Sequence, residues 1–206
     1  MPKLIPAILE SNFEGVWQKT QLLKQIGLDT THLDVMDGLA VPNECWGDAS
    51  LASELDIQLE VHLMVQNPLE VAIKWLKLPN VIRVILRSEE VKDYDKFFEL
   101  SRSCGSLGLA IDPMTYHAKV MTIIHQLDYL LIMGVTSGFS GQEFMPRALD
   151  RLDLAHALNS AVKIGVDGGM NEKTIPLVMA KKVDVINAAS YFWSGDMERK
   201  IKLIEG

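Results

Sequence analysis

The sequence is poor in cysteine, in basic residues and in long apolar runs, and each shortage argues against a class of protein. Cys45 and Cys104 are its two cysteines and have no CxxC spacing, which argues against a disulfide scaffold or a structural zinc finger. Lys and Arg total 20 against 27 Asp and Glu, a net charge of −7, without the basic block that nucleic-acid binding needs. No apolar run reaches the roughly 18–20 residues that span a bilayer.

The N-terminal segment also lacks the pattern of a signal peptide, because Glu10 interrupts an already short apolar stretch. The remaining composition, 48% hydrophobic and 23% charged residues, is typical of a globular core. No low-complexity stretch or Pro/Ser-rich linker divides the chain, so we expect a single domain over residues 1–206. These features predict a cytoplasmic enzyme or small-molecule binder.

Short apolar runs alternate with longer amphipathic ones along the chain. Several short runs are almost wholly aliphatic and β-branched, as strands buried on both faces should be. The predicted strands are 4–9, 32–35, 57–64, 81–86, 107–111, 127–133, 162–166 and 183–188. The predicted helices are 16–26, 48–55, 68–76, 93–103, 118–125, 147–158 and 174–181. Asn67 before Pro68, and Asn171 three residues before Thr174, are expected to cap two of these helices.

The alternation of eight predicted strands with helical segments predicts an α/β fold of the (β/α)8 TIM-barrel type. The length corresponds to about 26 residues per unit, near the lower end for such barrels. An open, doubly wound sheet is the competing fold, but no GxGxxG follows the first predicted strand. In a barrel the chemistry is expected at the C-terminal ends of the strands and in the loops that follow.

Four polar side chains fall at such predicted strand ends. His32 and Asp34 are two residues apart and therefore share one face of a strand, while His62 and Asp167 end two other apolar runs. Singly, each is more often a hydrogen-bonded core histidine or a turn-forming aspartate. Together they favour a metal site, because buried carboxylates are costly unless they are paired or bound to metal. Zinc or ferrous iron suits mixed nitrogen and oxygen ligands best, with manganese or cobalt as alternatives.

Glycine-rich segments follow the last three predicted strands, at 136–142, 166–171 and 187–190. Loops after the seventh and eighth strands of a barrel commonly bind phosphate through backbone N–H groups, and the 136–142 loop is expected to close over a ligand. Singly these glycines are turn residues, but together they predict a phosphorylated substrate. Met36, Met64 and Met133 also fall at strand ends, where they either fill gaps or form a polarizable lining.

These motifs, in this order, resemble the ribulose-phosphate 3-epimerase family over essentially the whole chain. The matching segments are His32-Leu-Asp-Val-Met-Asp-Gly38, Val41-Pro-Asn43, Val61-His-Leu-Met64, Gly138-Phe-Ser-Gly-Gln142 and Val166-Asp-Gly-Gly169. The resemblance implies a cytoplasmic isomerase of the pentose phosphate pathway that inverts C3 between D-ribulose 5-phosphate and D-xylulose 5-phosphate. It also implies a homo-oligomer, a dimer or higher.

The resemblance assigns roles to the singled-out residues. His32, Asp34, His62 and Asp167 would hold one divalent metal ion, and Asp34 and Asp167 would also be the catalytic acid/base pair. Met36, Met64 and Met133 would line the site. The phosphate would be bound by Gly138, Gly141, Gly168, Gly169, Ala189 and Ser190.

The chemistry of inversion explains why two carboxylates and a metal are needed. One group removes a proton from one face of the carbon, and a second group returns a proton to the opposite face. A carboxylate with a pKa of about 3.9 is a weak base for a proton next to a ketone. A metal ion acting as a Lewis acid compensates by stabilising the cis-enediolate.

Several positions depart from the family pattern and bear on which sugar is bound. Ala7 stands where serine is usual, Leu39-Ala40 where His-Phe is usual, and Thr136-Ser137 where Asn-Pro is usual. Asn187 replaces an aliphatic residue, Ala189 replaces a glycine, and a histidine usual near residues 85–86 is missing.

The departures leave three alternatives to the pentose-phosphate activity. A sister epimerase acting on allulose 6-phosphate would keep the metal and the bases while altering the loops. A phosphate-binding barrel of the decarboxylase type, a lyase, would need a Lys–Asp charge array, and no lysine accompanies His32, Asp34 or His62. A non-catalytic phosphate binder would have no need to keep all four ligands.

Overall fold

The computed structural model describes residues 1–104, 106–115 and 118–206. Their contacts form two compact units. The first unit comprises Met1–Pro6 and Leu109–Gly206, and the second comprises Ala7–Gly108. The boundaries fall inside strands β1 (Lys3–Ile8) and β6 (Leu107–Ile111), so each unit contains part of both strands.

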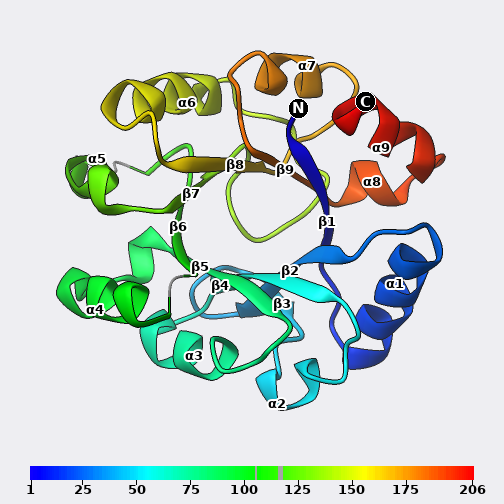
Figure 1. The fold of residues 1–206 in the computed structure, drawn as a ribbon, viewed down its shortest axis with the longest axis horizontal. Helices are drawn as coiled ribbons and strands as arrows, with labels where there is room; N and C mark the ends of the chain where they lie inside the picture. The colour runs from blue at the N-terminus through cyan, green and yellow to red at the C-terminus, as the bar shows by residue number, and fades with distance from the viewer. Residues whose placement is uncertain (105, 116–117) are drawn as a thin grey trace. The chain divides into compact units, whose positions relative to one another are not determined.

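The second unit is built on parallel strands. The end of β1 pairs with β2 (Thr30–Asp37), β2 pairs with β4 (Gln58–Met64), and β4 pairs with β5 (Val81–Arg87). A two-residue strand, β3 (Glu44–Cys45), pairs antiparallel with the end of β2. Figure 1 shows the helices of this unit beside these strands. They are α1 (Phe13–Gln25), α2 (Ala49–Ala52), α3 (Pro68–Trp75), the 3-10 turn η1 (Ser88–Glu90) and α4 (Tyr94–Cys104).

The first unit repeats this arrangement with the remaining strands. The start of β1 pairs with β9 (Val185–Ala188), β9 with β8 (Lys163–Asp167), β8 with β7 (Tyr129–Met133), and β7 with β6, all in parallel. Its helices are α5 (Ala118–Ile123), the 3-10 turn η2 (Ile124–Gln126), α6 (Arg147–Leu158), α7 (Thr174–Met179), α8 (Ser190–Trp193) and α9 (Met197–Glu205). Both chain termini belong to this unit (Figure 1).

Local sequence signals account for several helix starts. The side chain of Asn12 accepts a hydrogen bond from the backbone N–H of Gly15 and caps α1. Asn171 accepts from the N–H groups of Lys173 and Thr174 at the start of α7, which agrees with its predicted capping role. Asn67 differs from its prediction. It has a left-handed backbone (φ 50°) and makes no capping hydrogen bond, and the proline at the start of α3 needs no N–H partner.

The predicted strands all appear, with ends shifted by a few residues. The largest change is in β2, which extends the predicted run 32–35 because buried threonines precede it and β3 pairs with its last two residues. The predicted helix 48–55 shortens to α2, and α8 and α9 are helices that the sequence pattern missed. In the described part of the chain, eight parallel strands each precede at least one helix, which is the element order of a (β/α)8 barrel.

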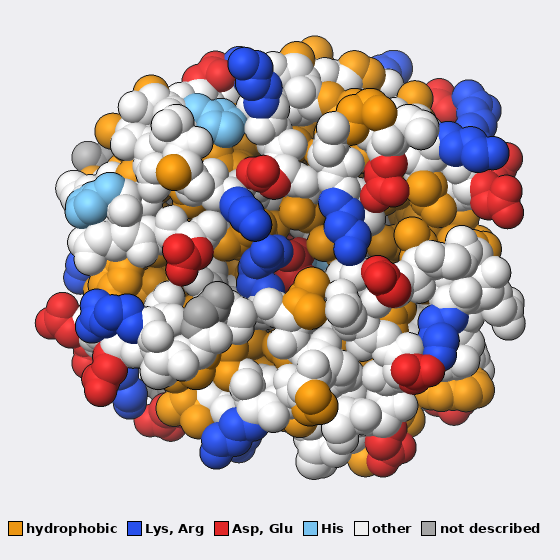
Figure 2. Space-filling view, viewed as in Figure 1, with side chains coloured by type: hydrophobic (Ala, Val, Ile, Leu, Met, Phe, Trp, Pro, Cys, Tyr) orange, Lys and Arg blue, Asp and Glu red, His pale blue; other side chains and the backbone are white. Residues whose placement is uncertain are grey.

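The distribution of charge on the surface agrees with the absence of a basic block from the sequence. On the face drawn in Figure 2, Lys and Arg side chains are interspersed with Asp and Glu side chains and with apolar ones. Opposite charges so mixed give no continuous basic surface among the described side chains of that face. No helix within the described residues has the length and apolar character needed to cross a membrane.

Candidate metal centre and active site

The parallel register of β2 and β4 brings three of the predicted ligands together. His32 and Asp34 lie on one face of β2, two residues apart. Asp34 is the register partner of His62 on β4. The three side chains are 4% exposed or less, so the strands hold them in the interior, where polar groups need partners.

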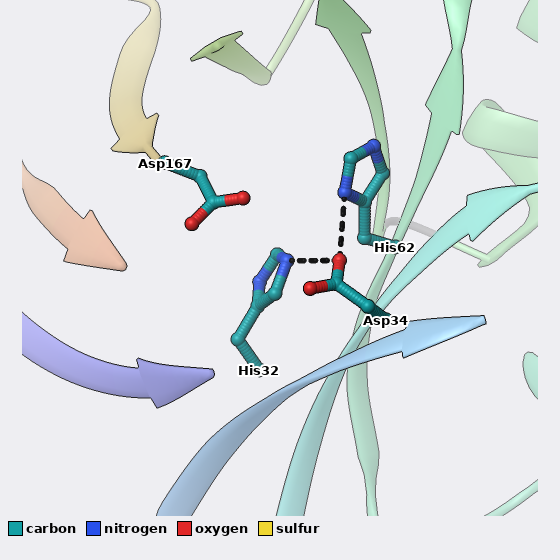
Figure 3. Close-up of side chains that lie close together, drawn as sticks. All are labelled: His32, Asp34, His62 and Asp167. Carbon is teal, nitrogen blue, oxygen red and sulfur yellow. Dashed lines mark hydrogen bonds and ion pairs between the residues drawn. The ribbon is translucent and has the colours of Figure 1, made fainter. Parts of the chain in front are cut away.

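Asp34 is the centre of this group (Figure 3). Its Oδ1 atom lies 3.1 Å from Nδ1 of His62 and 3.4 Å from Nε2 of His32. The two imidazole rings are 5.5 Å apart between centroids and inclined at 58°. Two ring nitrogens therefore face one carboxylate oxygen.

Burial and charge act in opposite directions on these groups. Burial alone lowers the pKa of His32, but the carboxylates of Asp34 and Glu60 outweigh it and raise the pKa well above 6.5. Burial alone raises the pKa of Asp34, and the hydrogen bonds and charges of His32 and His62 outweigh it, so that the pKa falls well below its usual range. Asp34 is therefore ionised at neutral pH.

The donor set fits a divalent cation. Among the described residues, Nε2 of His32 has no closer polar partner than Oδ1 of Asp34 at 3.4 Å, and Nδ1 of His62 lies 3.1 Å from the same oxygen. One ligand atom from each of His32, Asp34 and His62 lies within 4.8 Å of those of the other two. Tetrahedral coordination with bonds of roughly 2.0–2.1 Å places neighbouring ligand atoms about 3.3 Å apart. The observed separations of 3.1 and 3.4 Å are close to that spacing.

A fourth buried polar residue, Glu60, adjoins this group and was not among the residues predicted from sequence. Its Oε1 lies 2.8 Å from Nδ1 of His32, its register partner on β2. Its Oε2 accepts a hydrogen bond from Nη1 of Arg83 on β5. The missed signal was that Glu60 and His62 are two residues apart, as His32 and Asp34 are, so that each pair lies on one face of its strand.

Asp167 is the last residue of β8, as predicted, and it is buried. It pairs in register with Met133 of β7, and its carbonyl oxygen accepts a 2.6 Å hydrogen bond from the N–H of Gly134. Figure 3 also labels its side chain. Gly168 and Gly169 follow with φ values of 90° and 71°, a backbone conformation that favours glycine.

Neighbouring groups also require glycine at these two positions. A Cβ on Gly168 would lie 2.5 Å from a methyl carbon of Val135. A Cβ on Gly169 would lie 2.7 Å from the Cα of Phe144. The segment is tied to the start of α7, because the hydroxyl of Thr174 donates to the carbonyl oxygen of Gly169 at 2.9 Å. The backbone conformation of the segment after β8 therefore depends on glycine at both positions.

The predicted 136–142 loop is also ordered by hydrogen bonds to its own backbone. The side-chain amide of Gln142 donates to the carbonyl oxygens of Thr136 and Phe139, both at 2.7 Å. Gly141 has a φ of 77°, and a Cβ placed on it would have no atom within 4 Å, while Gly138 has a φ of 127°. The other predicted phosphate residues, Ala189 and Ser190, lie at the start of α8.

The three predicted lining methionines are all buried. Met36 and Met64 are register partners on β2 and β4 and belong to one apolar cluster with Val41 and Cys45. The Sγ of Cys45 lies 3.8 Å from the Sδ of Met36. Met133, the last residue of β7, belongs to the first unit.

The residues that depart from the family pattern differ in exposure. Ala7 is buried and is the register partner of His32, and Asn187 is buried and is the register partner of Asp167. Leu39, in contrast, is 69% exposed. Two of the departures therefore adjoin predicted ligands, and one lies on a loop surface.

Solved structures share this architecture. The tryptophan synthase α-subunit of Pyrococcus furiosus, a mutant form, matches with a TM-score of 0.66 at 14% identity, over 98% of this chain and 96% of that one. The α-subunit from Campylobacter jejuni matches with a TM-score of 0.60 at 14% identity, over 99% and 94%. The chain therefore has the (β/α)8 barrel fold, as predicted, and it carries a buried His/Asp group that can bind a divalent metal.

Sequence comparison identifies the family. The profile of the ribulose-phosphate 3 epimerase family matches residues 3–193. The ribulose-phosphate 3-epimerase of Chlamydia pneumoniae is 31% identical, over 98% of this chain and 93% of its own length. That of Aquifex aeolicus is 30% identical, over 98% and 96%. The chain belongs to the ribulose-phosphate 3-epimerase family, and the predicted resemblance is confirmed.

Proposed function

We propose that this protein is a metal-dependent epimerase that inverts C3 of a ketose phosphate, interconverting D-ribulose 5-phosphate and D-xylulose 5-phosphate. The observation that carries the proposal is the buried group of His32, Asp34 and His62 on the adjacent parallel strands β2 and β4. Asp34 and His62 lie in the C-terminal halves of these strands, and catalytic groups of a barrel are found toward the C-terminal ends. Membership of an epimerase family supports the reaction class.

Asp167 is proposed as the fourth ligand of the metal ion, with His32, Asp34 and His62 as the other three. The support is its place as the buried last residue of a barrel strand, because a barrel collects the C-terminal ends of its strands at one face. We propose zinc or ferrous iron, which suit mixed nitrogen and oxygen ligands. When bound, such an ion supplies a Lewis acid that polarises a substrate carbonyl.

The two aspartates are proposed as the acid/base pair. Asp34 has a lowered pKa and is ionised at neutral pH, so it can accept the C3 proton from one face of the substrate. Asp167 in its protonated form would donate a proton to the other face, and the reverse reaction exchanges the two roles. Inversion needs both, because a single carboxylate returns the proton to the face from which it came.

The phosphate is proposed to bind the backbone N–H groups of the glycine segments and of the residues at α8. These are Gly138, Gly141, Gly168, Gly169, Ala189 and Ser190. The positive φ values of the four glycines support this assignment, because such a backbone can turn N–H groups toward an anion. Met36, Met64 and Met133 are proposed to line the substrate cavity.

An epimerisation assay with controlled metal content tests the proposal. The protein is stripped with a chelator, reconstituted with zinc or ferrous iron, and assayed with ribulose 5-phosphate and allulose 6-phosphate. We expect turnover of ribulose 5-phosphate that disappears on stripping and returns on reconstitution. Turnover of allulose 6-phosphate alone would reassign the substrate, and turnover of neither sugar by the metal-loaded protein would overturn the epimerase proposal.

A further inference from the structure

Two contacts link three side chains from β2 across β4 to β5. Nδ1 of His32 lies 2.8 Å from Oε1 of Glu60, and Oε2 of Glu60 accepts from Nη1 of Arg83. The side chains of His32 and Glu60 are 0% exposed, and that of Arg83 is 20% exposed. A carboxylate this deeply buried is costly unless both of its oxygens have partners, and here both do.

The first contact determines which imidazole nitrogen can bind a metal. A carboxylate only accepts hydrogen bonds, so Nδ1 of His32 must carry the proton that it donates to Glu60. In the neutral ring the lone pair is then on Nε2, which faces Oδ1 of Asp34 at 3.4 Å. A nitrogen lone pair and a carboxylate oxygen turned toward each other need a cation between them, which is a proton in the metal-free protein and a divalent ion in the loaded one.

We propose that Glu60, held by Arg83, is a positioning residue that fixes His32 in the tautomer and orientation in which Nε2 can bind a divalent cation. The inference rests on the proposed metal centre and goes beyond its ligand set. A carboxylate behind a metal-binding histidine orients the ring, and its loss typically weakens metal binding by about 10–100-fold.

Arg83 determines which atom of a substituted side chain at position 60 faces His32. In Glu60→Gln the new side chain has the same shape but only one acceptor oxygen. Arg83 can only donate, so it attracts that oxygen and leaves the amide NH2 facing Nδ1 of His32. The ring must then carry its proton on Nε2, which is the wrong tautomer for metal binding. Removing the guanidinium with Arg83→Met frees the amide to turn its oxygen back toward His32.

The experiment measures zinc dissociation constants by competition with a chromophoric chelator. We expect Glu60→Gln to bind zinc about 10–100-fold more weakly than wild type. Glu60→Gln combined with Arg83→Met should recover at least half of that loss on a logarithmic scale. Glu54→Gln, which changes an exposed carboxylate, is the matched control and should bind as wild type does.

A third variant separates positioning from a purely structural ion pair. Replacing a buried ion pair with apolar side chains is often neutral for stability, so Glu60→Met with Arg83→Met is expected to fold. If the pair were only structural, this variant would keep wild-type zinc affinity. A positioning role predicts weaker binding by about 10–100-fold with an unchanged circular dichroism spectrum.

NMR of the zinc-loaded protein supplies a second readout. With 15N-labelled histidine, wild type should show a slowly exchanging proton on Nδ1 of His32 and no proton on Nε2. Wild-type zinc affinity in both Glu60→Gln and the double methionine variant would overturn the inference and leave the epimerase proposal intact. Failure of wild type to bind zinc would overturn the metal centre itself. If Glu60→Gln and the double methionine variant bind zinc more weakly while zinc-loaded wild type turns over neither sugar, the inference is supported and the epimerase proposal is overturned.

Discussion

The His/Asp group on β2 and β4 and the segment after β8 are built in opposite ways. At β2 and β4 the chemistry lies in side chains: Asp34 contacts both His32 and His62 on two strands that pair with each other in continuous parallel register. After β8 a single carboxylate, Asp167, is followed by two glycines with positive φ, and neighbouring groups occupy the space that a Cβ would need. One region offers side-chain ligands, and the other offers a shaped backbone.

The difference determines how each region responds to substitution. On β2 and β4 a polar side chain can be replaced by another of similar shape while the strand pairing stays intact. Such a substitution should therefore abolish metal binding and catalysis before it lowers stability. In the glycine segment an added methyl group meets neighbouring atoms, so stability should be lost with or before function. Substitutions in the two regions should therefore separate loss of function from loss of stability.

The largest effect is expected for Asp34→Asn. The substitution removes the charge that faces both histidines and the proposed base, so kcat should fall by at least about 10^4-fold. Zinc affinity should fall as well, while the free energy of unfolding of the metal-free protein changes far less. Asp56→Asn is the control, because the Asp56 side chain is 86% exposed and forms an ion pair with the surface residue Lys24. Wild-type turnover by Asp34→Asn would contradict both roles.

Asp167→Asn extends the comparison to the single carboxylate of the glycine region. Epimerisation should fall by about 10²–10⁴-fold, because one of the two proposed proton-transfer groups is lost. Exchange of the C3 proton with deuterated solvent should persist through Asp34, and mass spectrometry of the recovered substrate measures it. The control is Asp153→Asn, an exposed partner of Lys181. Full epimerase activity in Asp167→Asn would contradict the two-base assignment.

The strand region was the more predictable one from sequence. Period-two alternation placed His32 and Asp34 on one face, and parallel register then made Asp34 the partner of His62. The same rule would have found Glu60, but one charge within an apolar run was interpreted as part of a strand. Arg83 could not have been assigned to it, because that contact depends on the register between β4 and β5, which is irregular next to Glu60.

The fold was predictable where apolar runs are long and failed where helices are short. The alternation of strands and helices predicted the barrel, which the comparisons confirm. The four-residue helix α8 has no periodicity to detect, and the capping role predicted for Asn67 fails because its backbone is left-handed. The single domain, the homo-oligomer and the cytoplasmic location stay predictions.

A matched pair of glycine substitutions sharpens the contrast from the backbone side. Gly169→Ala adds a Cβ at positive φ and 2.7 Å from the Cα of Phe144, and we expect it to lower the free energy of unfolding by about 2–4 kcal/mol. Gly141→Ala has a similar φ of 77° with no atom within 4 Å of the new Cβ, so it should cost only about 1 kcal/mol. Urea unfolding measures both. Equal losses would show that neighbouring atoms impose no constraint at Gly169.

The smallest effect is expected at Asp37, a carboxylate near the metal group whose role is structural. Its Oδ1 accepts from the N–H groups of Leu39 and Ala40, both at 2.9 Å, and its Oδ2 accepts from the N–H of Gln66 at 2.7 Å. Asp37→Ala should therefore lower the free energy of unfolding by about 1–2 kcal/mol and leave zinc affinity within about threefold of wild type. A zinc defect as large as that of Asp34→Asn would place Asp37 in the metal centre.

The pH dependence of that loss identifies its cause. Burial alone raises the pKa of Asp37, and the backbone N–H groups outweigh it, so the folded pKa lies below its ordinary value. A lowered pKa means that the ionised carboxylate stabilises the folded state above the unfolded pKa of about 3.9, and that this stabilisation is lost as pH falls through the folded pKa. The difference between wild type and Asp37→Ala in urea unfolding should thus be constant from pH 7 to 5 and shrink below about pH 4. A difference that persists undiminished in acid would mean that the Asp37 side chain stabilises the fold through packing and not through its charge. Asp34 would then be the last residue of β2 whose carboxylate charge matters.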